Sequence, residues 1–198
     1  MSKNVIVNIR GTSGSGKSTI AFEFLKRFPN EALTGKDGKI KGYRVNTAEA
    51  GLDYDVFILG KYTTVCGGLD ACPTQAEAGD LAVKAYEQGG HVLAEGLLAS
   101  AAGPKGAFTD AIYQTGAAIF AILDTPLQVC LDRVRARRAA KGNNKPFNEK
   151  NTLDKWTQVH STAKALHTLG YDVRPIDHTQ AFEDVLQIFR EAEENELR

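Results

Sequence analysis

The sequence has 198 residues and a mass of 21.4 kDa, with 42% apolar and 24% charged residues. This composition is typical of a globular domain and excludes a collagen-like, disordered or disulfide-scaffold chain. Twenty-four basic residues balance twenty-four acidic ones, so the chain lacks the overall positive field that holds nucleic acids or anionic membranes non-specifically. A polyanionic partner would need a local basic patch. We expect one domain over residues 1–198.

Two features of the chain bear on its location. No stretch of about 18 consecutive apolar residues occurs, and the first residues lack the charged region and cleavage site of a signal peptide. The three cysteines are an odd number, which favours reduced thiols over a set of disulfides. We therefore expect a cytoplasmic protein with no membrane segment.

The first expected elements are a strand, a glycine-rich turn and a helix. Residues 4–10 contain the apolar run VIVNI, and the helix is expected over 17–28, ended by Pro29. The polar, glycine-interrupted stretch 31–53 favours turns and short antiparallel strands. DVFILG, which ends at Gly60, has the continuous apolar pattern of a buried strand. The loop that follows, KYTTVCGGLDACP, is long enough to form a site.

The rest of the chain alternates helices with buried strands. Helices are expected over residues 74–88, 108–114, 127–141, 152–169 and 181–196, and the strands are the buried run HVLAEG, the all-apolar run AAIFAILD and, last, YDVRPID. Continuously apolar strands separated by helices indicate a parallel sheet that is covered on both faces. The sequence therefore predicts a three-layer α/β fold with a mostly parallel, five-stranded sheet. In such a sheet functional loops gather at the carboxyl ends of the strands.

The most specific motif is GTSGSGKS at residues 11–18, which matches G-x-x-x-x-G-K-[ST] between a predicted strand and a predicted helix. Its glycines let successive amides face phosphate oxygens, Lys17 adds charge at the β- and γ-phosphates, and the Ser18 hydroxyl can bind Mg²⁺. We expect a P-loop NTPase fold that binds a nucleoside triphosphate. The expected nucleotide-binding residues are Gly11, Thr12, Ser13, Gly14, Ser15, Gly16, Lys17, Ser18 and Thr19.

Two acidic residues and one aromatic residue are candidates for chemistry at the strand ends. Glu95 ends a buried strand, where a carboxylate can hold Mg²⁺ or polarise an attacking hydroxyl, or can cap the next segment. Asp70 lies in the long loop and is a candidate general base, with turn capping as the alternative. The sequence leaves open which of the two is the base. Tyr62, in the same loop, is a candidate for contact with a base or sugar.

A basic cluster follows the predicted fourth parallel strand. Residues 132–150 include seven basic and two acidic side chains, and Arg133 and Arg137 share a helix face at i, i+4. This arrangement predicts a mobile arginine-rich lid at about residues 133–150 that closes on a transferring phosphoryl group. The alternative is a solvated helix face. The lid helix and the loop at 177–179 are expected to bound the adenine.

A P-loop does not by itself name the reaction, because GTPases, motor ATPases and kinases all have one. The NKxD and DxxG motifs expected of a GTPase do not occur in the sequence. The strand HVLAEG ends in a single carboxylate, unlike the tandem acids of many motor ATPases. Of these three classes, a small kinase is therefore the one that the sequence favours. A nucleotide-dependent binding module is the alternative from a different class.

The order of GTSGSGKST, a strand ending in Glu95-Gly96, and LDTP leading into RVRARR resembles the small P-loop kinases of the nucleoside and nucleotide kinase class. That resemblance covers nearly the whole chain. Within the class, GKYTTVCGGLDACPTQ and HVLAEGLLAS are similar to bacteriophage kinases that phosphorylate 5-hydroxymethyluridine in DNA. The resemblance implies substrate binding by Tyr62, Gly67, Gly68 and Asp70, magnesium binding by Ser18 and Glu95, and catalysis by Lys17, Asp70, Glu95, Arg133 and Arg137.

The resemblance also implies transfer of the ATP γ-phosphoryl group to a 5-hydroxymethyl oxygen in DNA, inside the host cytoplasm if the protein is phage-encoded. The base must leave the duplex stack, which predicts a pocket with an aromatic wall that Tyr62 could supply. A kinase of a free nucleotide, nucleoside or other metabolite is the alternative, and the oligomeric state is open. Outside the lid, the basic residues nearest for the DNA backbone are Lys36, Lys39, Lys41 and Arg44.

Overall fold

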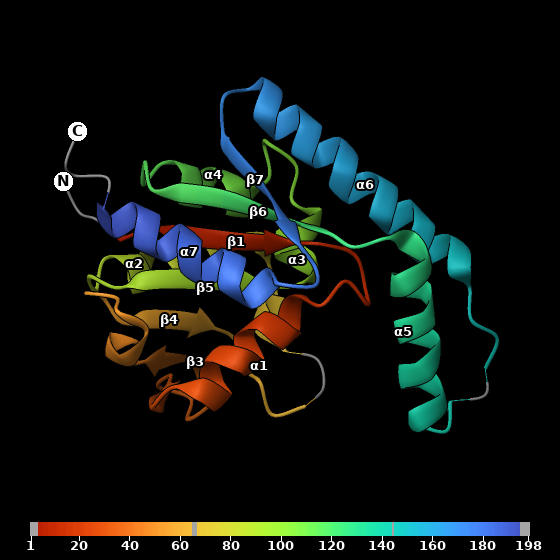
Figure 1. The fold of residues 1–198 in the computed structure, drawn as a ribbon, viewed down its shortest axis with the longest axis horizontal. Helices are drawn as coiled ribbons and strands as arrows, with labels where there is room; N and C mark the ends of the chain where they lie inside the picture. The colour runs from red at the N-terminus through yellow and green to blue at the C-terminus, as the bar shows by residue number, and fades with distance from the viewer. Residues whose placement is uncertain (1–3, 65–66, 144, 195–198) are drawn as a thin grey trace.

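The computed structural model describes residues 4–64, 67–143 and 145–194, which form one seven-stranded sheet with helices packed on it (Figure 1). The strand order is β2-β3-β4-β5-β1-β6-β7. The strands are β1 (Ile6–Arg10), β2 (Asn30–Thr34), β3 (Ile40–Val45), β4 (Val56–Leu59), β5 (His91–Glu95), β6 (Ala118–Asp124) and β7 (Asp172–Asp177). The α-helices are α1 (Lys17–Arg27), α2 (Gln75–Tyr86), α3 (Leu97–Ala101), α4 (Ala107–Tyr113), α5 (Leu127–Ala140), α6 (Glu149–Thr168) and α7 (Ala181–Glu194).

The prediction of a five-stranded sheet is wrong, because the sheet has seven strands. The five expected strands do form the parallel strands β4, β5, β1, β6 and β7. The two further strands, β2 and β3, extend the sheet as an antiparallel hairpin within the stretch 31–53, where short antiparallel strands were expected. β2 is exposed along most of its length, so it lacks the continuous apolar pattern of a buried strand.

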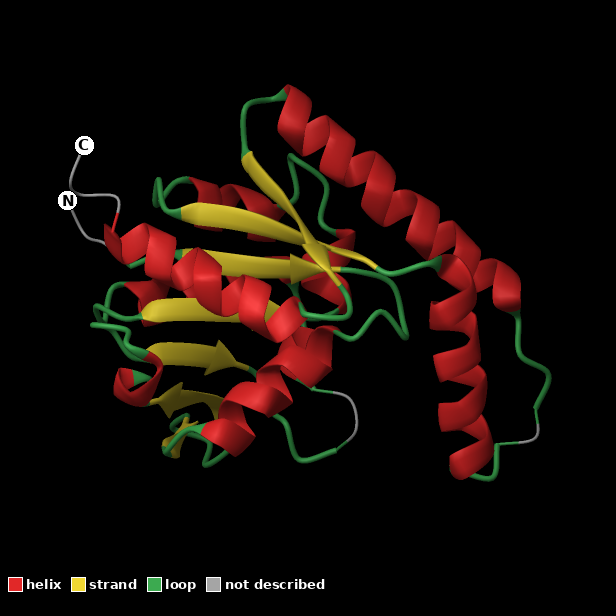
Figure 2. Ribbon diagram, viewed as in Figure 1, coloured by secondary structure: helices red, strands yellow, loops and turns green. Residues whose placement is uncertain are grey.

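Helices cover both faces of the sheet, as the apolar strands predict (Figure 2). On one face, Phe24 of α1 and Phe189 of α7 belong to a buried cluster with alternate residues of β1. On the other face, Phe108 of α4 and Leu166 of α6 belong to a second cluster that also includes α2 and α3. The central strands β4, β5, β1 and β6 are therefore buried between two apolar layers.

All five parallel strands end at the same edge of the sheet, which we call the carboxyl edge. The loops that follow β1, β4, β5, β6 and β7 meet there, and α5 projects beyond the sheet at this edge (Figure 1). Within the described ranges, no helix has the length and apolar character needed to cross a membrane. Cys72 and Cys130 are free thiols, and Cys66 lies outside the described residues.

Arg10, the last residue of β1, fastens the segment between α3 and α4 to the carboxyl edge. Its fully buried guanidinium donates to the Ala102 carbonyl at 2.7 Å, the Thr109 hydroxyl at 2.9 Å and the Asn8 side chain at 2.7 Å. It also lies over the Phe120 ring, 4.7 Å from the centroid. Burial lowers the pKa of Arg10 to about 9. These bonds hold the strand rigidly just before the glycine-rich loop begins.

Candidate active site

The glycine-rich loop joins β1 directly to α1, as the motif predicts. Gly16 caps α1 with a φ of 110°, in the left-handed region that favours glycine. The Lys17 ammonium folds back over the loop and donates to the carbonyls of Gly11 at 2.8 Å and Thr12 at 3.1 Å. The first amides of α1 have no partner within the helix, so this end can bind an anion. The loop thus has the form of a phosphate-binding P-loop.

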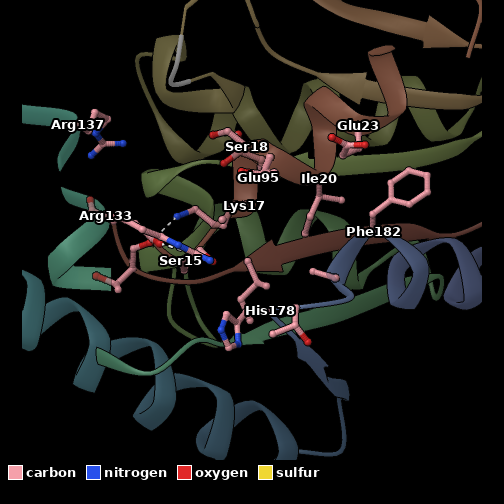
Figure 3. A pocket seen from close by; sticks show the side chains of 18 of the residues that line it. Ser15, Lys17, Ser18, Ile20, Glu23, Glu95, Arg133, Arg137, His178 and Phe182 are labelled. Atoms are coloured by element: carbon pink, nitrogen blue, oxygen red, sulfur yellow. Dashed lines mark hydrogen bonds between the residues drawn. The ribbon is translucent and has the colours of Figure 1, made fainter. Parts of the chain in front are cut away.

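A pocket of about 1030 Å³ opens above the P-loop (Figure 3). Its walls come from the P-loop and α1, the loops after β4 and β5, one face of α5, and the loop that joins β7 to α7. That last wall includes residues 178–180, which overlap the loop 177–179 expected to bound the adenine. The charged and hydroxyl side chains that bear on phosphate chemistry are Lys17, Ser18, Asp70, Glu95, Arg133 and Arg137. The structure therefore brings the predicted catalytic residues to one pocket.

Glu95 is held in the pocket floor by two hydroxyl groups. Its Oε1 accepts a hydrogen bond from Ser18 Oγ at 2.9 Å and another from Tyr62 Oη at 3.0 Å, and the side chain is only 1% exposed. A Cβ at Gly68 would lie 2.6 Å from the same oxygen, so only glycine leaves room for the carboxylate. Burial raises the pKa of the Glu95 carboxyl, although Lys17, Ser18 and Tyr62 act in the opposite direction.

Asp70 faces the pocket from the loop after β4 and lies in the electrostatic field of Lys17. Burial lowers the pKa of the Lys17 ammonium, while Glu95 and then Asp70 raise it. The Asp70 side chain is exposed, and its Oδ1 accepts a hydrogen bond from the Leu97 amide at 2.5 Å. This bond ties the long loop to the start of α3. The two carboxylates therefore differ, since Glu95 is buried and Asp70 is open to the pocket.

Tyr62 does not form the aromatic pocket wall that its sequence position suggests. Its ring is 7% exposed and packs edge-on against Phe22 at 5.5 Å, and it is not part of the pocket lining. Burial and the neighbouring Glu95 raise the pKa of its phenol well above the ordinary value. The hydroxyl positions Glu95, so the geometry favours an indirect role over direct substrate contact.

Gly67 and Gly68 shape the loop around these side chains. Both are buried and neither lines the pocket. A Cβ at Gly67 would overlap the Tyr62 ring, and Gly68 lies against Glu95. Contact of these two glycines with a substrate stays a prediction, while their small size is required for the packing of Tyr62 and Glu95.

Leu97 is one of the pocket residues that sequence reasoning missed. It is 47% exposed, lines the pocket, and follows Glu95 and Gly96 directly. Its backbone amide is the group that Asp70 accepts from. The sequence signal for this position is an apolar residue that comes directly after Glu95 and Gly96, beyond the end of the buried strand. Leu97 gives the wall of the pocket next to Asp70 an apolar surface beside a carboxylate.

The first half of α5 is fastened to the P-loop. Arg133 Nη1 donates to the carbonyls of Gly14 at 3.3 Å and Ser15 at 3.2 Å, and the Thr125 hydroxyl donates to Ser15 at 2.9 Å. Gly14 has a φ of 83°, and a Cβ there would overlap the Cys130 carbonyl. Arg133 therefore lines the pocket as part of a fixed contact between α5 and the P-loop.

Arg137 lines the pocket one helical turn beyond this contact, and Figure 3 shows both arginines entering from α5. The other arginines of the helix bind elsewhere. Arg135 pairs with Glu149 at 2.5 Å, and Arg138 donates to the Lys145 carbonyl at 2.6 Å. The helix thus directs two arginines to the pocket, one to Glu149 at the start of α6, and one to the loop between α5 and α6. Movement of residues 133–150 as a lid stays a prediction.

The residues beside the P-loop fit a magnesium ion. Ser18 Oγ and Glu95 Oε1 lie 2.9 Å apart, and both are the hard oxygen ligands that Mg²⁺ prefers. Among the residues that the structure describes, no group of three or more His, Cys, Asp or Glu side chains could hold a metal ion. A magnesium ion in this pocket would therefore depend on phosphate oxygens and water for most of its ligands, as is usual for nucleotide-bound Mg²⁺.

A P-loop, two carboxylates and two helix-borne arginines in one pocket at the carboxyl edge define an α/β protein of the P-loop kinase type. The chain is 35% identical over 190 residues to the "5-hmdU DNA kinase" of Pseudomonas phage PaMx11, covering 95% of this chain and 98% of that protein. It is 32% identical over 197 residues to the protein of the same name from Pseudomonas phage M6, covering 90% and 94%. The chain belongs to this family of phage kinases.

Two further comparisons concern protein-family models and solved structures. No protein-family model matches the sequence. Among solved structures, deoxyadenosine kinase from M. mycoides is similar over 98% of this chain and 100% of that one, with 11% identity and a TM-score of 0.45.

Proposed function

We propose that this kinase transfers the γ-phosphoryl group of ATP, with Mg²⁺, to the 5-hydroxymethyl group of 5-hydroxymethyluridine in DNA. The observation that carries the proposal is the meeting of Lys17, Asp70 and Glu95 in one pocket above the P-loop. The choice of acceptor is supported by the relatives, which are named 5-hmdU DNA kinases. Such an enzyme would act in the cytoplasm of an infected host.

The P-loop side of the pocket would bind the triphosphate. Lys17 now donates to two loop carbonyls and would exchange those bonds for phosphate oxygens, while the first amides of α1 bind the β-phosphate. Ser18 and Glu95 would hold Mg²⁺, which would supply positive charge next to the transferring group. Arg137, which enters the pocket from α5, would add its positive charge to that of Lys17. These groups stabilise charge where it develops in the transition state.

We assign the role of general base to Asp70. The hydroxymethyl oxygen forms a bond to the γ-phosphorus as the bond to the ADP oxygen breaks, and its proton passes to the Asp70 carboxylate. Asp70 suits this role because it is exposed to the pocket and is oriented through one oxygen by the Leu97 amide. Glu95 suits it less, since Oε1 accepts from two hydroxyls and the side chain is buried. We therefore place Glu95 on the magnesium side.

The acceptor base would pack on Leu97. A pyrimidine that reaches the pocket has left the duplex stack, at a cost of a few kcal/mol, and needs an apolar surface in exchange. Leu97 supplies that surface next to Asp70. Tyr62 acts behind it as a positioning residue for Glu95. Residues of α5 beyond Arg133, together with the loop to α6, would close over the phosphates as the lid.

The test is a transfer assay with γ-labelled ATP and magnesium. The acceptors are duplex DNA that contains 5-hydroxymethyluridine, the same duplex with thymine, and free 5-hydroxymethyl-dUMP. We expect label in the modified duplex and none in the thymine duplex. Label in the free nucleotide alone would reassign the protein to the metabolite kinases. ATP turnover that no hydroxyl acceptor stimulates would indicate a nucleotide-dependent binding module instead.

A further inference from the structure

The turn between β2 and β3 lies at the carboxyl edge, next to the acceptor side of the pocket. β3 is antiparallel to β4, so the arrows of the two strands point in opposite directions (Figure 2). The start of β3 therefore lies beside the end of β4, where the Gly60 amide donates to the Lys41 carbonyl at 2.8 Å. The turn itself, residues 35–39, extends from this contact. The hairpin thus borders the loop that carries Asp70.

Four lysines are exposed on this border, and we call them the hairpin basic patch: Lys36, Lys39, Lys41 and Lys61. Asp37 is the acidic residue of the turn, and its carboxylate accepts from the Lys39 amide at 3.1 Å and pairs with Lys41 at 3.2 Å. That pair is exposed, so it contributes little and weakens with salt. In the described part of the chain, Lys36, Lys39 and Lys61 form no ion pair with an acidic side chain. The backbone amide of Lys39 and, to a smaller extent, its charge nevertheless help to lower the pKa of Asp37. The patch therefore has a net positive charge.

Arg44 does not belong to the patch, although it is close to these lysines in the sequence. It lies near the end of β3, at the opposite edge of the sheet, where it pairs with Asp55 at 2.6 Å and approaches Glu31 at 4.0 Å. Its charge is used within the protein and far from the pocket. The expectation that Arg44 supplies charge for a DNA backbone is therefore not supported by its position.

The hairpin of β2 and β3 packs against the loop that carries Asp70. Leu33 of β2 contacts the buried cluster that includes Leu69, the residue before Asp70. Burial raises the pKa of the Cys72 thiol, and Glu77 acts in the same direction, while the Lys41 charge lowers it, which places Lys41 near the end of this loop. The hairpin basic patch therefore lies on the side of the pocket next to Asp70, whereas α5 covers the side next to the P-loop.

We propose that the hairpin basic patch binds the sugar-phosphate backbone of the DNA strand that carries the target base. The proposal rests on the proposed function, in which the acceptor is a base in DNA. An extruded base that packs beside Asp70 leaves its flanking phosphates outside the pocket mouth, on the side where the patch lies. A chain with balanced charge needs such a local patch to hold a polyanion. The patch binds DNA without contributing to the chemical step.

The test compares two double variants of the full-length protein that each remove two positive charges. Lys36→Gln with Lys39→Gln alters the patch, and Lys84→Gln with Lys164→Gln is the matched control, because both control lysines are exposed near the far ends of α2 and α6. Binding of a duplex containing 5-hydroxymethyluridine is measured against salt concentration. We expect the patch variant to bind about tenfold more weakly and its log–log salt slope to fall by about two. The kcat at saturating DNA and the KM for ATP stay unchanged.

Three results would overturn the inference. Equal DNA affinity and equal salt slopes in the patch variant and the wild type would show that DNA lies elsewhere, and the proposed function would stand. An equal loss in both double variants would show only a general charge effect. If the wild-type protein labels the free nucleotide and not the DNA, the proposed function fails first, and the inference fails with it.

Discussion

The hydrogen bond from Tyr62 to Glu95 gives the sharpest prediction, and the perturbation is Tyr62→Phe. The substitution removes one hydroxyl and keeps the ring that packs against Phe22. The lost bond is 3.0 Å long and joins two side chains that are 7% and 1% exposed. A hydrogen bond to a charged group contributes about 1.5–3 kcal/mol. For a protein of this size that corresponds to a decrease in Tm of about 3–12 °C.

The decrease in stability should depend on pH in a definite direction. Burial raises the pKa of Glu95 in the folded state above its unfolded value, and the Tyr62 hydroxyl opposes that rise. A group of this kind contributes stability that is fully present below the unfolded pKa and is lost as pH rises through the folded pKa. Tyr62→Phe raises the folded pKa further. The variant is therefore destabilised little at acidic pH and by the full amount at alkaline pH.

The assay is thermal unfolding without nucleotide at about pH 5 and about pH 8. Tyr171→Phe is the control, because its hydroxyl donates to the neutral Pro104 carbonyl at 3.4 Å and its effect should not vary with pH. Phosphoryl transfer by Tyr62→Phe should also fall about tenfold, with the KM for ATP nearly unchanged. A decrease in Tm that is equal at both pH values would refute the coupling between Tyr62 and the Glu95 carboxylate.

Three further predictions concern the pocket. Lys17→Ala should reduce transfer of label from γ-labelled ATP by about 10³-fold or more, and retained transfer would contradict the P-loop mechanism. Asp70→Asn should lower kcat by about 10²–10⁴-fold while ATP affinity, measured by calorimetry, stays the same; a small effect would move the base to Glu95. Arg137→Ala should lower kcat with little change in ATP affinity, whereas Arg133→Ala should weaken ATP binding and lower Tm, because Arg133 is bonded to P-loop carbonyls. Identical kinetics for the two arginine variants would count against separate roles.

Local sequence signals were sufficient for the parallel sheet and the P-loop. β4, β5, β1 and β6 are mainly apolar, buried runs, β7 follows a helix that ends just before Gly170, and the glycine-lysine motif has its own fixed geometry. The hairpin of β2 and β3 was harder to recognise as part of the sheet, since β2 is largely exposed and its residues face solvent. The pairing of β2 with β3 shifts register between Leu33 and Thr34, and a strand without a buried apolar face specifies its register weakly.

The roles of individual loop residues depended on tertiary packing. Tyr62 lies in a polar, glycine-rich loop, so its sequence context suggested exposure, yet Gly67 and Gly68 let the backbone fold tightly enough to bury it. Because Tyr62 is buried, it does not contact the pocket as predicted, and its hydroxyl instead positions Glu95. Leu97 differs in the opposite sense: its apolar side chain follows a buried strand but is exposed in the pocket. Neither outcome follows from residue type alone, since both depend on how the two loops meet.

The contact between α5 and the P-loop limits how a lid can move. Arg133 and Thr125 are both bonded to the Gly14–Ser15 segment, and the Gly14 backbone lies directly against Cys130. A rotation of the whole helix would break these bonds and separate surfaces that are packed together. The predicted lid, residues 133–150, would therefore close only through the part of the helix beyond Arg133 and the loop that follows it. Arg137 stands at the start of that part, so such a closure would change its distance to bound phosphates, whereas Arg133 would stay bonded to the P-loop.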